Sequence, residues 1–157
     1  MKNQIKKMFA VALIAIAGVF TQSAYAQMKP MDGSKMAMSK YSFSESVDII
    51  KGAIEEQNLM VIHVVDGQKM MRMAGKQTKG MKQIFFFHPK YMAKVLAANK
   101  MAGMAIPFKM IVMEKPDGKV VVRYMMASTA LKQYKGTEAV AKELDTLILK
   151  VIKEATN

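Results

Sequence analysis

The chain has 157 residues, with 24 Lys and Arg against 12 Asp and Glu, and it contains no cysteine. The lack of cysteine excludes disulfide bonds, thiolate nucleophiles and cysteine-based metal sites, so packing must stabilise the fold. The formal net charge of +12 at pH 7 is compatible with binding to nucleic acid or to another anionic surface.

Residues 1–26 are typical of a secretory signal peptide. Three lysines precede an apolar run from Met8 to Phe20, and Ala24–Ala26 supplies small residues at the cleavage positions. The apolar run is too short for a membrane-spanning helix, which needs about 20 residues. We therefore predict an exported protein, periplasmic or secreted, without a transmembrane span after cleavage.

Cleavage after residue 26 leaves 131 residues with 21 basic and 12 acidic side chains, a size that suits one domain with a single core. A basic exported domain meets anionic envelope surfaces or acidic partners rather than nucleic acid. The expected partner is an unknown ligand or a component of the envelope, and the oligomeric state stays open.

Residues 27–40 are predicted to be a flexible tether, because Pro, Gly, Ser and Lys occur there without helical or strand periodicity. This tether contains Met28, Met31, Met36 and Met38. Thioethers are soft ligands that select Cu(I), and a flexible segment can gather three or four sulfur atoms around one ion. The alternatives are an oxidant-absorbing segment and a plain linker. Cu(I) is the alternative cofactor, and otherwise none is expected.

Residues 41–157 are predicted to form a single α+β domain. Runs of β-branched and aromatic residues indicate strands, and apolar residues at one-face spacing indicate helices. In chain order these patterns predict a short strand at Tyr41–Phe43, a helix capped by Ser44 and ending near Asn58, a strand at Leu59–Asp66, a short helix at Gln68–Gly75, a strand at Met81–Phe87 and a helix from Pro89 to about Asn99.

The stretch Ile106–Tyr124 predicts a β-hairpin. Two runs rich in β-branched residues flank Lys115–Gly118, in which Pro presets φ and Gly accepts a positive φ. A three-residue loop pairs Val112 with Val122, which makes one face wholly apolar and the other mixed. A long amphipathic helix follows, with Thr137 as its expected cap. Strands joined by hairpins and long returns predict an α+β fold with a mainly antiparallel sheet and helices on one face.

Four segments match a known pattern in order along the chain. Ser44–Val47 opens a helix, Leu59–Asp66 is a buried strand that ends in Asp, Phe86–Pro89 leads into a second helix, and Ile106–Tyr124 combines a Pro-containing start, an acidic turn and a terminal Tyr. From about residue 41 to about residue 131 the chain resembles the bacterial family called domain of unknown function 302.

The resemblance implies a β-α-β(4)-α fold of the TATA-binding-protein-like class, with a curved antiparallel sheet. It implies no reaction, because the activity of the family is not established. The chain departs from the family pattern at Gly67, where members commonly have His, and at Phe87-His88, which replaces Gly-Asn. A ligand site that the family would build on those residues is therefore not carried over.

The sequence shows no established catalytic motif, and no catalytic residue is predicted. His63 lies within a β-branched strand, which favours a structural histidine in the core or at an edge over a catalytic base. His88 and Met92 are four residues apart at the start of a predicted helix and form a second candidate ligand pair for a metal.

These observations support three hypotheses. The leading one is an exported binding or interaction module, not an enzyme, which uses its sheet face or a pocket between sheet and helices. The alternative is a methionine-rich periplasmic protein that binds or handles Cu(I). The third is an enzyme of unknown reaction, with His63 or His88 in a pocket.

Overall fold

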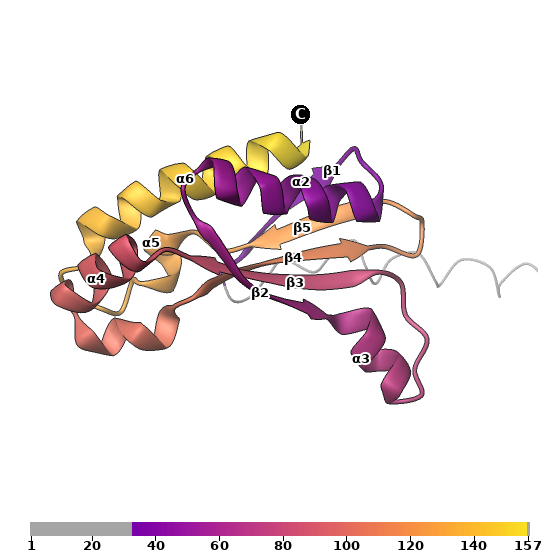
Figure 1. The fold of residues 1–157 in the computed structure, drawn as a ribbon, viewed down its shortest axis with the longest axis horizontal. Coiled ribbons are helices and arrows are strands. Elements are labelled where there is room, and N and C mark those ends of the chain that lie inside the picture. Colours follow the sequence, from indigo (N-terminus) through magenta and orange to yellow (C-terminus); the bar gives the residue numbers. More distant parts are fainter. Residues whose placement is uncertain (1–32, 157) are drawn as a thin grey trace, which may run out of the picture. The chain divides into compact units, whose positions relative to one another are not determined.

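The structure, a computed structural model, describes residues 33–156. The predicted signal peptide and the candidate ligands Met28 and Met31 lie outside these residues. The elements in chain order are β1 (Lys35–Ser39), α2 (Phe43–Glu56), β2 (Met60–Asp66), α3 (Gly67–Met73), β3 (Met81–Phe87), α4 (Pro89–Ala98), the 3-10 helix η1 (Lys100–Ala105), β4 (Phe108–Glu114), β5 (Val120–Tyr124), α5 (Ala127–Ala130) and α6 (Glu138–Thr156) (Figure 1).

The strands form one sheet in the order β1-β5-β4-β3-β2, and every neighbouring pair is antiparallel. Helices α2 and α6 pack against each other; α2 also contacts β3 and β4, while α6 contacts β1 (Figure 1). This arrangement confirms the predicted α+β fold and its β-α-β(4)-α order, to which α3, α4, η1 and α5 are additions.

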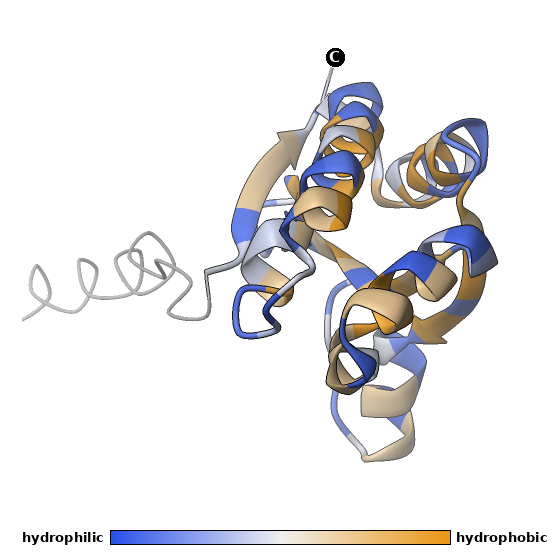
Figure 2. Cartoon of the chain, turned by 90° about the vertical axis from the view of Figure 1, so that its left-hand side faces the viewer, coloured by the Kyte–Doolittle hydropathy of each residue, from blue (hydrophilic) through white to orange (hydrophobic). Residues whose placement is uncertain are grey.

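The core lies between the sheet and the helices α2 and α6. Side chains alternate between the two faces of a strand, so every second residue of β4 and β5 points toward the helices. Figure 2 shows orange and blue residues around each of these helices, as their amphipathic sequences require. The fully buried side chains include Ile50 and Ile54 of α2, Ile84 of β3, Met110 and Val112 of β4, Val122 of β5, and Leu144 and Ile148 of α6.

The hairpin of β4 and β5 has the predicted register, with Val112 opposite Val122. The amide of Lys115 donates to the carbonyl of Lys119 at 2.8 Å, and the amide of Gly118 donates to the carbonyl of Lys115 at 2.9 Å. Gly118 has a φ of 79°, a left-handed conformation that glycine adopts without strain. The loop chemistry read from the sequence is therefore confirmed.

The predicted tether at residues 27–40 is wrong for its last part, because Lys35–Ser39 forms β1 and pairs with β5. The side chains of this segment alternate between two environments. Ala37 packs against the buried core residues, whereas Met36 and Met38 on either side of it are exposed. Edge strands of natural sheets are often short and carry charged side chains, so a polar composition does not exclude one.

The predicted strand at Tyr41–Phe43 and the predicted cap at Ser44 are also wrong, because α2 begins at Phe43 with Ser42 as its cap. The Ser42 hydroxyl accepts from the Glu45 amide, and the Glu45 carboxylate accepts from the Ser42 amide at 3.0 Å. This reciprocal capping box satisfies two backbone donors at the helix start, which outweighs the β-propensity of two aromatic residues.

We predict that replacing Gly80 by Ala destabilises the protein by about 1–3 kcal/mol, because overpacked side chains must move. A Cβ at Gly80 would lie 2.7 Å from the ring of Phe43, the first residue of α2. Chemical denaturation gives the free energy of unfolding of each variant.

The matched control is Gly52→Ala in the middle of α2, where a new Cβ has no neighbour within 4 Å. This change should raise the free energy of unfolding by about 0.5–1 kcal/mol, because alanine is the better helix former. Equal effects of the two substitutions would contradict the packing of Phe43 on Gly80.

Candidate functional site

The described part of the chain holds no group of three or more His, Cys, Asp or Glu that could bind a metal ion. Within residues 33–156, no helix has both the length and the apolar character needed to cross a membrane. The candidate sites in these residues are therefore surfaces and small polar clusters.

One face of the sheet points away from α2 and α6, and we call it the helix-free face. Residues that pair across neighbouring strands share a face, so the register identifies its members. They are Met36 and Met38 of β1, Val121 and Arg123 of β5, Lys109, Ile111 and Met113 of β4, Met81, Gln83 and Phe85 of β3, and His63 and Val65 of β2.

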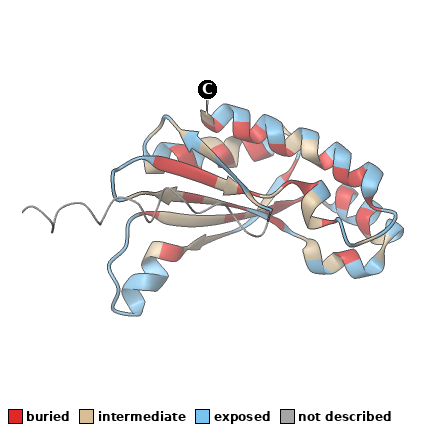
Figure 3. Cartoon of the chain, turned by 180° about the vertical axis from the view of Figure 1, so that it is seen from behind, coloured by how far each residue is buried: buried red, intermediate tan, exposed pale blue. Residues whose placement is uncertain are grey.

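The helix-free face combines apolar area with positive charge. Met81, Phe85, Ile111 and Met113 are half-buried in its centre, and Figure 3, seen from behind, shows the strands on this side. Lys109 and Arg123 are its charged residues, and none of its members is acidic. Such a surface suits a ligand that has an apolar body and an anionic group.

Arg123 is held in place on this face by a neighbouring hydroxyl. Its Nε donates to the Oγ of Ser34 at 2.7 Å, which connects β5 to the residue just before β1. The guanidinium of Arg123 is planar and permanently charged. The position of the positive charge on the face is therefore determined by the pairing of β1 with β5.

The structure brings together two of the four methionines predicted to bind copper. Met36 and Met38 are 50% and 48% exposed and lie two residues apart on one side of β1. In an extended strand this spacing separates their Cα atoms by about 6.6 Å. The two thioethers therefore share one side of an edge strand, while Met28 and Met31 lie outside the described residues.

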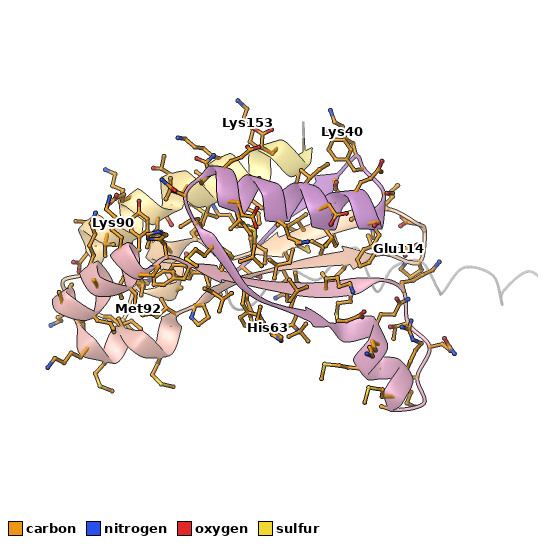
Figure 4. The ribbon with its side chains drawn as sticks, in the orientation of Figure 1. Lys40, His63, Lys90, Met92, Glu114 and Lys153 are labelled. Carbon is orange, nitrogen blue, oxygen red and sulfur yellow. The ribbon has the colours of Figure 1, made fainter. Side chains whose placement is uncertain are left out.

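The second predicted ligand pair, His88 and Met92, lies at the start of α4. His88 is the N-terminal cap of this helix, and its Nδ1 accepts from the amide of Lys90 at 3.1 Å. This hydrogen bond leaves only Nε2 for a metal. Met92 lies one turn further along α4 and is exposed (Figure 4).

His63 is exposed on β2, an edge strand (Figure 4), which is one of the two positions, core or edge, predicted for it. A register shift between Val61 and His63 marks an irregularity at this point of the strand. His63 and His88 therefore lie on separate elements. Neither of them lines the open hollow beside α4 and α6.

A polar cluster between α4 and α6 was not predicted. The hydroxyl of Tyr91 donates to Oε1 of Glu143 at 3.0 Å, and Nζ of Lys94 lies 2.7 Å from Oε2 of the same carboxylate. The cluster borders an open hollow of about 340 Å³ whose wall includes Lys94, Gly136 and Glu143. Because Tyr91 and Glu143 are 52 positions apart in the chain, local sequence patterns give no signal for this contact.

The charges in this cluster shift two pKa values in opposite directions. The hydrogen bonds from Lys94 and Tyr91 lower the pKa of Glu143. Burial raises the pKa of Tyr91, and its hydrogen bond to Glu143 raises it further. Both shifts favour the state in which Tyr91 is protonated and Glu143 is charged, so the cluster links the two helices at neutral pH.

Gly67, where the chain departs from the family pattern, is the first residue of α3. A Cβ there would meet Cε of Met81, the end of a flexible side chain that can move aside. Asp66 caps the helix by accepting from the amide of Lys69 at 2.8 Å, and it also pairs with Lys82 at 2.6 Å. The hydrogen bonds from Lys82 and Lys69 lower the pKa of Asp66.

The sequence model of a family described as domain of unknown function DUF302 matches residues 35–155. The solved structure of an uncharacterized conserved DUF302 protein from Bacillus stearothermophilus is similar with a TM-score of 0.73 and 12% identity, covering 78% of this chain and 98% of that one. No curated protein matches the chain. The structural match shows the fold alone.

We predict that the protein loses stability as the pH falls through the acidic range. The pKa values of Glu143 and Asp66 are lowered in the fold from ordinary values of 4.5 and 3.8. Each carboxylate therefore contributes stability that is fully present above its ordinary pKa and is lost as the pH falls through its lower folded-state pKa. Thermal unfolding followed by circular dichroism across this range measures the loss.

The variant Glu143→Gln should unfold at a lower temperature than the wild type at neutral pH and converge with it in acid, because the wild type has then lost the same charge. Glu154→Gln is the control on α6, since the exposed side chain of Glu154 makes no hydrogen bond or ion pair within residues 33–156. If Glu143→Gln and the wild type lost equal amounts of stability on acidification, the role of the cluster would be contradicted.

Proposed function

The chain belongs to the family described as domain of unknown function DUF302, and from that premise we propose that it is an exported binding module whose ligand lies on the helix-free face of the sheet. The observation that carries this proposal is the combination of apolar side chains with Lys109 on one sheet face, none of whose described members is acidic. Export is supported by the sequence of residues 1–26.

The chemistry of the face favours binding over catalysis. Ile111, Met113 and Phe85 provide apolar contact area, and methionine side chains adapt to ligands of irregular shape. Lys109, which is exposed opposite Phe85, lies beside this area and attracts an anion. These groups hold and orient a ligand, and none of them is a nucleophile paired with a base. The proposed ligand is thus a small amphipathic anion.

Anilinonaphthalene sulfonate, an aromatic anion whose fluorescence rises in apolar surroundings, is a suitable probe. We predict saturable binding to the folded protein and a roughly tenfold or greater loss of affinity in the variant Ile111→Glu, since it removes a large apolar contact and adds negative charge. Fluorescence titration measures both affinities, and circular dichroism verifies that the variant remains folded.

Leu149→Glu is the matched control, because Leu149 is 47% exposed on α6 and receives the same chemical change away from the face. Its affinity for the probe should equal that of the wild type. An equal loss in both variants, or no saturable binding to the wild type, would contradict a ligand site on the helix-free face.

A second candidate function is Cu(I) binding, which is favoured by the position of Met36 and Met38 on one side of β1. The donor set is chemically suitable, because two thioethers from the strand and two from Met28 and Met31 are soft and neutral. The positive charge of Lys35 and Lys40 beside them opposes the binding of a cation. Because of this electrostatic repulsion, Cu(I) binding ranks second, after ligand binding on the helix-free face.

We predict that the double substitution of Met36 and Met38 by Leu weakens Cu(I) binding, because leucine keeps the size of the side chain and removes the sulfur. Anaerobic titration of the mature protein against a competing chelator measures the affinity. The control replaces Met101 and Met104, two exposed methionines of η1, by Leu. Equal affinity of the wild type and the β1 variant would reject the β1 site.

A further inference from the structure

Exposed methionines gather on two short helices, α3 and η1. Met70, Met71 and Met73 are exposed on α3, which follows β2, and Met101 and Met104 are exposed on η1. Met73 and Met104 have 79% and 84% of their surface exposed. In Figure 4 the sulfur-tipped side chains of α3 and of residues 100–105 project from the lower side of the molecule. We call these five residues the methionine rim.

The α3 part of the rim is a defined projection of the fold. Asp66 caps the helix, and the side-chain amide of Gln68 donates to the carbonyl of Thr78 at 3.0 Å, which joins α3 to the connector that follows it. All residues from 71 to 79 are exposed, and Figure 3 shows this segment in pale blue. These contacts fix the position at which the exposed methionines of α3 are presented.

The projection carries positive charge and no negative charge of its own. Between Gly67 and Gly80 the charged residues are Lys69, Arg72, Lys76 and Lys79, and there is no Asp or Glu. The two nearest acidic side chains are already paired, because Asp66 contacts Lys82 at 2.6 Å and Glu114 contacts Lys79 at 3.6 Å. Residues 89–108, which include η1, also contain lysines and no acidic residue. Both parts of the rim therefore attract an anionic surface.

Pairing with a second copy of the chain through β2 is disfavoured by the same observations. Symmetric pairing of this edge would place cationic segments of two molecules together, which costs free energy. The register shift between Val61 and His63 also interrupts the regular row of backbone groups that an added strand requires. A partner for this side must instead be acidic and must contact separated projections at once.

We propose that the methionine rim docks the protein on an anionic lipid bilayer. Methionine tips enter the boundary between headgroups and acyl chains, while Lys69, Arg72 and Lys76 contact headgroup phosphates. An extended lipid surface accommodates two separated projections, whereas a protein partner would need two matched acidic pockets. The proposal does not depend on the ligand of the helix-free face, because the two surfaces share no residue.

The absence of tryptophan from the chain allows a single indole to report insertion. Met73→Trp and Met104→Trp probe the two parts of the rim, and Leu149→Trp on α6 is the matched control away from it. With the mature protein and vesicles of phosphatidylcholine and phosphatidylglycerol, both rim indoles should shift to shorter emission wavelengths and be quenched by brominated lipid. The control should do neither, and vesicles of phosphatidylcholine alone should give no shift.

Charge variants test the electrostatic part separately. Replacing Lys69, Arg72 and Lys76 by Gln should weaken vesicle affinity by about fivefold for each charge removed. Replacing Lys142, Lys150 and Lys153 of α6 by Gln gives the same change in net charge and should have little effect. Because all six side chains belong to exposed residues, both variants are expected to fold.

Three outcomes would overturn the proposal. They are no binding of the wild type to anionic vesicles, an equal response of the α6 indole and the rim indoles, and an equal loss of affinity in the two charge variants. Binding of the rim to an acidic polypeptide such as polyglutamate, without binding to vesicles, would assign the surface to a protein partner instead. None of these results bears on the binding of anilinonaphthalene sulfonate to the helix-free face.

Discussion

The structure depends on covering one face of a five-stranded sheet with two helices. The buried residues of α2 and α6 pack against each other and against alternate residues of the strands, including Met110, Val112 and Val122. A strand necessarily presents its remaining residues to the opposite face. Because α2 and α6 pack on the same side, the apolar residues Phe85 and Ile111 are left on the helix-free face, and its chemistry follows from the fold.

Local chemistry made the hairpin and several elements predictable. The turn at Lys115–Gly118 and the pairing of Val112 with Val122 needed only neighbouring residues, and they were correct. The strand β1 was missed because its stability comes from β5, whose paired residues lie 81 to 89 positions further along the chain. The start of α2 was misplaced because Ser42 and Ser44 are both good caps, and only the reciprocal bond with Glu45 distinguishes them.

The candidate surfaces were less predictable than the fold. Methionines at helical spacing, such as Met70 and Met73, usually fill gaps in a core, whereas both are exposed on α3. The sequence indicates that the second face of the hairpin carries both apolar and charged residues. That this face continues over Met81 and Phe85 follows only from the register of β3 against β4. The contact of Tyr91 with Glu143 likewise depends on how α4 meets α6. In each case, long-range pairing decides which side chains meet.

The central claim is that one fold presents two separate binding surfaces, a helix-free sheet face and a methionine rim. Nuclear magnetic resonance of isotope-labelled methionine methyl groups tests it directly, because Met81 and Met113 report the face, Met73 and Met104 report the rim, and Met110 reports the core. The account predicts that anilinonaphthalene sulfonate shifts the face signals, that anionic vesicles broaden the rim signals, and that Met110 responds to neither. One common set of signals responding to both additions would contradict it.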